Sequence, residues 1–155
     1  MANYSRMNKR KIINDPIYGF ITITSELIYN TLSHPYFQRL RHIKQLGLTD
    51  YVYPAALHTR FQHALGALHL MGKALDTLRF KGIEISDEEY EATQLAILLH
   101  DIGHGPFSHA LEDSLIPGIN HESLSYLFME KLNEEFTGAL ALTLKIFRNS
   151  YKRKF

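Results

Sequence analysis

Cysteine is absent from this chain of 155 residues. Its absence excludes disulfide bonds and thiolate ligands, so a bound metal would have to be held by histidine nitrogen and carboxylate oxygen. Those donors suit hard or borderline divalent cations. A chain without cysteine also fits a reducing compartment, and we expect a cytoplasmic protein.

Long apolar runs and an excess of one charge are missing as well. No window approaches the ~20 continuous apolar residues of a membrane span, and residues 1–7 lead into no apolar segment of a secretory signal. The net charge of +1 argues against a dominant polyanion-binding role, so nucleic acid is possible as a partner but not indicated. We expect a single domain over residues 1–155 with no membrane association.

The N-terminal region predicts two kinds of local structure. Residues 10–24 predict a short β-hairpin, because β-branched residues flank an Asn-Asp-Pro turn. Beyond it the apolar residues follow the three-and-four spacing of helices. Thr24 or Ser25 can cap a first helix. Ser33 can cap a second one that has Pro35 in its first turn, carries its periodic residues as far as Lys44 and is ended by Gly47.

The rest of the chain predicts further helices. A long one runs from about Arg60 to Phe80, and Ser86 with Glu89 forms a capping box for the next, which ends at a His-Asp pair. A short helix is expected over 109–115 and a last one over 137–147. Between them Asn120 caps a helix whose inward residues are expected to be Leu124, Leu127, Phe128 and Leu132. The sequence therefore predicts an all-α helical bundle with a short N-terminal β-hairpin.

The His100-Asp101 pair carries the clearest chemical signal. Adjacent helical residues diverge by about 100°, so these two could bind one ion only where the helix ends, and Gly103 and Gly105 supply that ending. His63, near the start of the long helix, is the best third ligand. Such a site would lower the pKa of bound water and favour attack on phosphorus. A lone histidine is more often structural than a ligand, so spacing by itself leaves both interpretations open.

Several motifs resemble one known superfamily. The runs at 60–63 (RFQH), 100–109 (HDIGHGPFSH) and 121–122 (HE) resemble, in this order, the motifs of HD-domain phosphohydrolases. Within that superfamily, the runs at 14–19 (NDPIYG) and 37–47 (FQRLRHIKQLG) resemble the deoxynucleoside triphosphate triphosphohydrolase branch. The resemblance implies an HD-domain helical bundle.

The resemblance also implies roles for particular residues. It makes His63, His100 and Asp101 ligands of a divalent metal ion, which could be manganese, iron, magnesium, nickel or zinc. It places His104, His109 and His121 on the phosphate side, as proton donors or cationic partners. It pairs Arg60 with phosphate and brings Gln45 to the sugar of a nucleotide. The implied reaction is hydrolysis of deoxynucleoside triphosphates to deoxynucleoside and triphosphate. The alternative is a non-catalytic or truncated HD module that binds nucleotide or metal or serves in assembly.

One element of the family pattern is not found. The family completes its metal site with a second aspartate well downstream, and none of the six aspartates here, Asp101 apart, has that context. We therefore expect the chain to be the N-terminal part of a longer protein. We also expect its last helix to expose apolar residues, which favours a homo-oligomer; these are Leu140, Leu142, Leu144 and Phe147.

Overall fold

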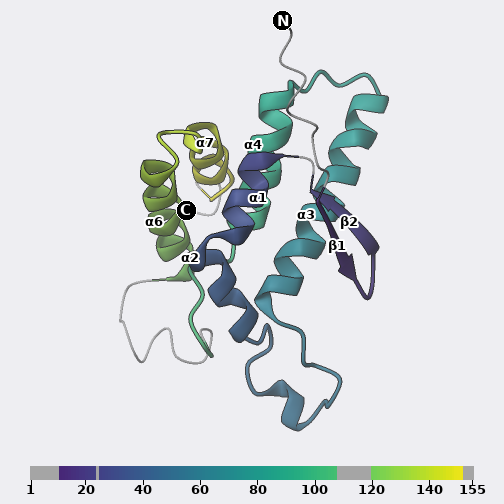
Figure 1. Ribbon diagram of the computed structural model, residues 1–155, viewed down its shortest axis with the longest axis vertical. Coiled ribbons are helices and arrows are strands. Elements are labelled where there is room, and N and C mark those ends of the chain that lie inside the picture. Colours follow the sequence, from purple (N-terminus) through teal and green to yellow (C-terminus); the bar gives the residue numbers. More distant parts are fainter. Residues whose placement is uncertain (1–10, 24, 108–119, 152–155) are drawn as a thin grey trace, which may run out of the picture.

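The computed structural model describes residues 11–23, 25–107 and 120–151, and within them it is a helical bundle with one β-hairpin (Figure 1). The predicted fold class is confirmed. The hairpin pairs β1 (Lys11–Asp15) with β2 (Gly19–Ile23). The α-helices are α1 (Glu26–Ser33), α2 (Pro35–Gln38), α3 (Arg60–Phe80), α4 (Asp87–Leu99), α6 (His121–Glu135) and α7 (Ala141–Tyr151), with 3₁₀ helices at Arg39–His42 and Thr49–Tyr51. The short helix expected over 109–115 lies outside the described residues.

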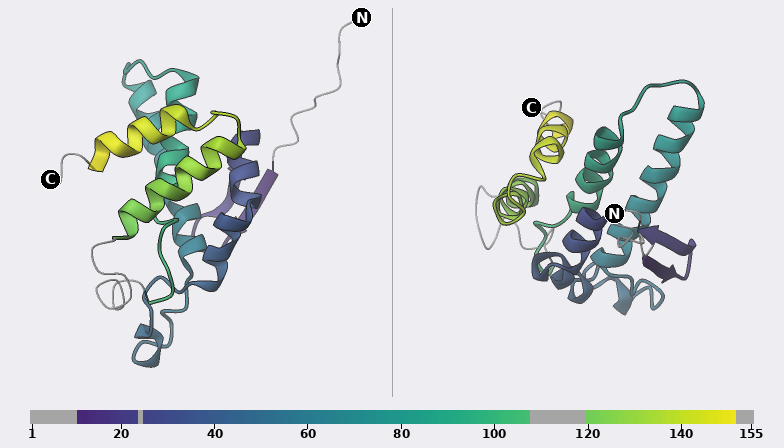
Figure 2. Two further views of the ribbon diagram at one scale, coloured as in Figure 1. Left: turned by 90° about the vertical axis from the view of Figure 1, so that its left-hand side faces the viewer. Right: turned by 45° about the horizontal axis from the view of Figure 1, so that its top comes forward.

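The helices form layers around α4. It packs against α3 on one side and against α7 on the other, and α6 packs against α7. The hairpin lies beyond α3 (Figure 2). Its Ile21 and Ile23 belong to the same buried core as the helices. Among the described residues, none of the helices combines the length and apolarity that crossing a membrane requires.

Local signals set the bounds of α3 and α4 as predicted. Both helices begin with a complete capping box, Thr59 with Gln62 and Ser86 with Glu89. After α3 the chain turns through Gly82, whose φ of +85° favours glycine. The two helices pack as an antiparallel pair, and both start and stop at positions that the sequence specifies.

Two predictions about the N-terminal helices are wrong. Ser33 is the last residue of α1 and does not cap α2; His34 does, because its Nδ1 accepts a hydrogen bond from the Tyr36 amide at 3.2 Å. The second helix stops at Gln38 and continues as a 3₁₀ helix to His42, so it does not reach Lys44. Lys44 instead forms an isolated β-bridge with Thr59, which ties this segment to the start of α3.

The C-terminal helices differ from prediction in which side chains they bury. Leu127 is 61% exposed, and the fully buried positions of α6 include Ser125 and Met129. Leu140 and Phe147 are buried in the core, so the expectation that they are exposed is wrong. The last helix also begins at Ala141 instead of about residue 137, because a turn through Gly138 precedes it.

Candidate metal centre

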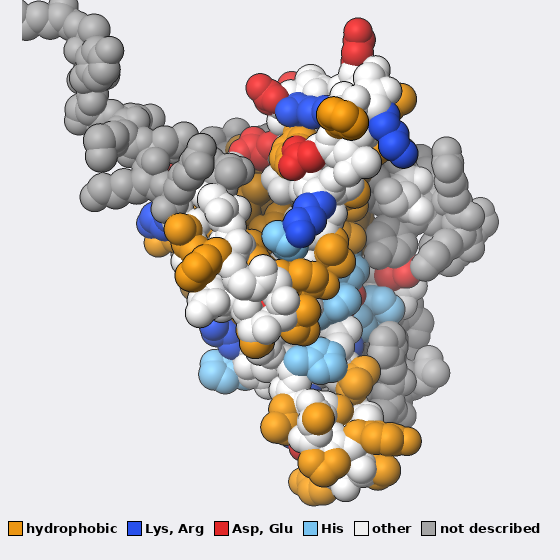
Figure 3. Space-filling model, turned by 90° about the vertical axis from the view of Figure 1, so that its right-hand side faces the viewer, with side chains coloured by type: hydrophobic (Ala, Val, Ile, Leu, Met, Phe, Trp, Pro, Cys, Tyr) orange, Lys and Arg blue, Asp and Glu red, His pale blue; other side chains and the backbone are white. Residues whose placement is uncertain are grey.

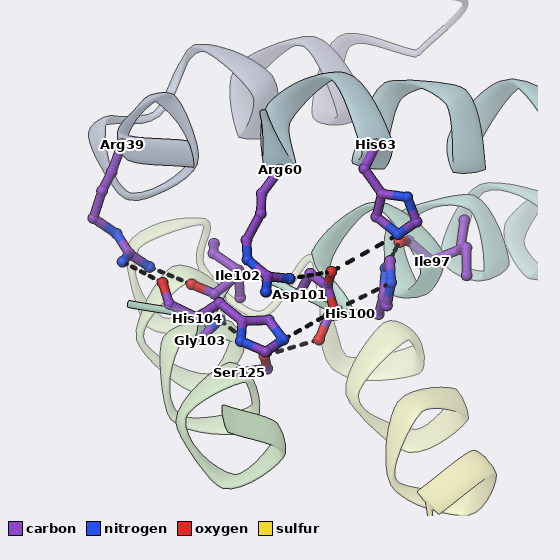
Figure 4. A network of polar contacts seen from close by, with 10 residues as sticks. All are labelled: Arg39, Arg60, His63, Ile97, His100, Asp101, Ile102, Gly103, His104 and Ser125. Carbon is purple, nitrogen blue, oxygen red and sulfur yellow. Dashed lines mark hydrogen bonds and ion pairs between the residues drawn. The ribbon is translucent and has the colours of Figure 1, made fainter. Parts of the chain in front are cut away.

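The three predicted ligands meet at the junction of α3 and α4 (Figure 4). His63 projects from the first turn of α3, while His100 and Asp101 follow the last residue of α4. His63 Nε2 lies 3.8 Å from Asp101 Oδ2, and His100 Nε2 lies 3.3 Å from Asp101 Oδ1. One ligand atom from each of the three residues can be chosen so that all lie within 4.8 Å of one another.

The end of α4 is what lets neighbouring residues converge. The helix closes with tighter i→i−3 hydrogen bonds, from the Ile102 amide to the Leu99 carbonyl and from the His104 amide to the Asp101 carbonyl. The change in backbone path brings the carboxylate of Asp101 beside the ring of the preceding histidine. The expected divergence of adjacent helical side chains is thereby overcome.

The hydrogen bond at His100 Nδ1 suits a metal ligand. Its Nδ1 lies 2.6 Å from the Ile97 carbonyl oxygen, which can only accept a hydrogen bond. With a proton on Nδ1 donated to this carbonyl, the neutral imidazole would offer Nε2, which lies 3.3 Å from Asp101 Oδ1, to a metal ion. A backbone carbonyl that orients a ligating imidazole in this way is common around protein-bound metals. The donor set therefore fits a divalent cation.

Asp101 is held as a carboxylate by positive neighbours. Arg60 Nη1 donates to its Oδ2 at 2.8 Å, and His104 Nε2 lies 3.5 Å from its Oδ1. Burial raises the pKa of the Asp101 carboxyl, but the hydrogen bond from His104 and the charges of His100, His104 and Arg60 outweigh burial and hold this pKa well below its usual range. The centre therefore contains a charged oxygen ligand at neutral pH.

Two of the three predicted phosphate-side histidines lie together. The rings of His104 and His121 stack with their centroids 3.9 Å apart and an angle of 15° between their planes. His104 is buried, and burial lowers its pKa despite its hydrogen bond to Asp101. His109 lies outside the described residues. The phosphate role of these histidines stays a prediction.

The two predicted substrate residues differ in their surroundings. Arg60 is only 3% exposed and is committed to Asp101, so its expected pairing with phosphate stays a prediction. The backbone N–H of Gln45 donates to the backbone carbonyl of His58 at 3.0 Å. The buried side-chain oxygen of Gln45 has no hydrogen-bond partner within the described part of the chain. That oxygen could accept a hydrogen bond from a ligand hydroxyl.

Two residues that sequence reasoning missed hold the turn after α4. Arg39 donates from Nη1 to the His104 carbonyl at 2.7 Å and from Nη2 to the Ile102 carbonyl. Ser125 Oγ donates to the His100 carbonyl at 2.9 Å and accepts from the Gly103 amide at 2.8 Å. Arg39 stands in a run that the family resemblance singled out, but nothing in the local sequence pointed to Ser125.

A cleft opens beside the centre. It has a volume of about 340 Å³ and lies between the hairpin turn and the first half of α3, where His63 shares its wall with Tyr18, Gly66 and Leu70. On this face of the molecule histidine side chains gather next to hydrophobic ones (Figure 3). One of the candidate metal ligands is therefore reachable from a partly apolar cleft.

The sequence profile of the HD domain family matches residues 60–151, which include all of α3, α4, α6 and α7. This chain belongs to the HD domain family. HD domains are metal-dependent, and the group of His63, His100 and Asp101 could hold the metal ion.

Individual relatives agree with this membership. The chain is 46% identical over 109 residues to human deoxynucleoside triphosphate triphosphohydrolase SAMHD1, covering 69% of this chain and 17% of that protein. It is 43% identical over 113 residues to the SAMHD1 homolog of Dictyostelium discoideum, which covers 72% of this chain and 22% of that protein. The crystal structure of a phosphohydrolase from Bacteroides thetaiotaomicron matches with a TM-score of 0.89 and 54% identity, covering 95% of this chain and 36% of that one. The chain thus spans about a fifth of these curated relatives, and the resemblance inferred from its motifs is confirmed.

Proposed function

We propose that this chain is a metal-dependent phosphohydrolase that hydrolyses deoxynucleoside triphosphates to deoxynucleoside and triphosphate. The observation that carries the proposal is the convergence of His63, His100 and Asp101, with their ligand atoms within 4.8 Å, beside the stacked pair of His104 and His121. The similarity to SAMHD1 proteins supports the choice of substrate. We further propose that the chain works in the cytoplasm and as a homo-oligomer.

Each residue has a defined task in the proposed reaction. A divalent cation at His63, His100 and Asp101 would polarise a phosphoryl oxygen and lower the pKa of bound water. Arg60 keeps Asp101 ionised, and the Ile97 carbonyl keeps the lone pair of His100 directed at the ligand position. Hydrolysis breaks the bond between phosphorus and the deoxynucleoside oxygen, and that oxygen must take up a proton. His104 and His121 are the candidate donors in the described part, with His109 as the third candidate from the sequence.

The test is release of triphosphate from each of the four deoxynucleoside triphosphates, with manganese, iron, magnesium, nickel and zinc supplied separately. We expect turnover with at least one of these metals. The double variant His100→Ala, Asp101→Ala is expected to lose it, while His42→Ala, which changes an exposed histidine outside the centre, should keep it. Full activity in the double variant would contradict the proposal.

A second candidate function is a non-catalytic module that binds metal or nucleotide. It is favoured by one observation: the described residues bring together three side chains that could hold a metal ion, whereas the family pattern has a further aspartate. Metal binding without turnover in the assay above would support the module, and turnover would exclude it.

A further inference from the structure

The turn from His100 to His104 is held through its backbone by side chains from two other elements. Carbonyl groups just after the end of a helix lose their partners inside the helix and need others. Here the carbonyls of His100, Ile102 and His104 and the amide of Gly103 are all satisfied by Arg39 and Ser125. The turn that carries Asp101 is therefore fixed from two sides.

Arg39 holds one side from the 3₁₀ helix Arg39–His42. Its two terminal nitrogens donate to carbonyls two residues apart, and because the guanidinium is planar and rigid, this fork sets the spacing of those carbonyls. The guanidinium carbon also lies 5.0 Å from the centre of the Phe128 ring on α6. Arg39 thus connects three elements at the turn.

Ser125 holds the other side from α6. It is completely buried, and its hydroxyl bridges the His100 carbonyl and the Gly103 amide. The backbone contact here is very close: a Cβ on Gly103 would lie 2.3 Å from the His121 carbonyl oxygen and from the Ser125 amide nitrogen. The turn and the first part of α6 are therefore packed backbone against backbone.

We infer that Arg39 and Ser125 are positioning residues of the metal centre. Within the described part of the chain, the side-chain hydrogen bonds of both residues go to backbone groups of the turn, and those groups decide where the Asp101 carboxylate and the His104 ring point. Residues around a metal's direct ligands typically change metal affinity by about 10–100-fold when they are mutated. This inference rests on the metal centre of the proposed function but does not require turnover.

The experiment measures Co²⁺ affinity and the visible Co²⁺ spectrum of the full chain. Arg39→Met removes both donors and retains a long apolar side chain that can still pack on Phe128. We expect it to weaken Co²⁺ binding by about 10–100-fold and to shift the absorption bands, because the coordination geometry changes. Arg39→Lys, which retains a positive donor, should recover part of the loss.

The matched control is Arg41→Met. Arg41 is exposed, lies 3.7 Å over the Phe61 ring and bonds Gln38, but it does not contact the turn in any described interaction. We expect its Co²⁺ affinity to stay within about twofold of the wild-type value. Denaturant unfolding of every variant separates a loss of stability from a loss of positioning.

Ser125→Ala keeps the inference testable if Arg39→Met does not fold, because it removes a single oxygen atom. It should also weaken Co²⁺ binding and speed hydrogen exchange at the Gly103 amide. A folded Arg39→Met or Ser125→Ala chain with wild-type affinity and spectrum would overturn the inference, even if the enzyme is active. A wild-type chain that binds Co²⁺ but releases no triphosphate would refute only the proposed function, and a wild-type chain that binds no Co²⁺ would overturn the inference.

Discussion

Two arginine–aspartate pairs connect the segments of α3 and α4, one at each end of this antiparallel pair. Arg60 and Asp101 lie 2.8 Å apart, and their side chains are only 3% and 11% exposed. Arg79 and Asp87 lie 2.9 Å apart at the other end, where the aspartate is 99% exposed. The chemical groups and the distances are nearly the same, so the two pairs differ chiefly in their access to water.

Access to water decides what each pair can do. Charges in water attract one another weakly, and the Arg79 pair mainly supports the connection after α3, where Arg79 also donates to the Ile85 carbonyl. At the buried end the carboxylate is surrounded by Arg60, His63, His100 and His104. Burying a charge is costly unless it is paired, and perturbed groups of this kind cluster at functional sites. Burial therefore distinguishes the Arg60–Asp101 pair, which belongs to the candidate metal centre, from the exposed Arg79–Asp87 pair, which is structural.

The largest expected difference comes from removing each aspartate's charge. Asp101→Asn should abolish Co²⁺ binding and lower the free energy of unfolding by about 3 kcal/mol, because Arg60 stays buried without its charged partner. Asp87→Asn should leave Co²⁺ affinity and the unfolding midpoint nearly unchanged. Equal losses from the two substitutions, measured by denaturant unfolding and Co²⁺ titration, would show that burial is not what distinguishes the pairs.

Adding a methyl group near each pair should sharpen the contrast. Gly103→Ala is expected to cost about 2–3 kcal/mol or more, because its Cβ would meet backbone atoms at 2.3 Å. Gly72→Ala, toward the exposed end, places its Cβ 2.9 Å from Nε2 of the Gln94 side chain, which can move aside. Alanine also favours a helix more than glycine, so we expect this second change to be nearly neutral. Thermal and denaturant unfolding of both variants would measure the difference in their free energies of unfolding.

The buried end should also make stability depend on pH. Burial lowers the pKa of His104 in the folded chain, although its hydrogen bond to Asp101 opposes this. The neutral ring is then favoured by folding, so its contribution is complete above the unfolded pKa of about 6.5 and is lost as the pH falls below that value.

Unfolding in the presence of a chelator, at pH 7.5 and at pH 5.5, measures this effect. We expect His104→Gln to lose less stability than wild type between these two conditions. The control His42→Gln, which changes an exposed histidine, should lose as much as wild type. If His104→Gln lost as much stability as wild type between pH 7.5 and pH 5.5, His104 would not be the source of the pH dependence of stability.

The smallest effect is expected for a hydroxyl beside the exposed pair. The Tyr90 hydroxyl donates to Asp76 Oδ1 at 3.0 Å, while Arg79 lies 4.7 Å over the Tyr90 ring. Tyr90→Phe keeps the ring and removes the hydrogen bond, so we expect a loss of about 0.5–1 kcal/mol and no change in Co²⁺ affinity. A weaker Co²⁺ affinity in this variant would mean that the two ends are coupled.

Much of the fold and of the ligand trio could be predicted because the signals are local. Capping boxes and glycine turns act within a few residues, so the bounds of α3 and α4 were predicted correctly. The N-cap of α2 was ambiguous because two polar residues that could cap it, Ser33 and His34, are neighbours. His34 caps the helix, although the sequence favoured Ser33. The burial of Leu127 on α6 was predicted wrongly, because which face of α6 is buried depends on how α7 packs beside it.

The sequence by itself determined the helical elements, the nitrogen and oxygen donors available to a metal, and the helix end at which His100 and Asp101 could meet. Only the tertiary structure decided which arginines would serve the centre. Arg39, Arg60 and Arg79 are the same residue type, yet the first reaches carbonyls 63 and 65 residues away and the second a carboxylate 41 residues away. Arg79 bonds groups only 6 and 8 residues away and stays near the surface. Such long-range contacts depend on packing, which local sequence does not encode.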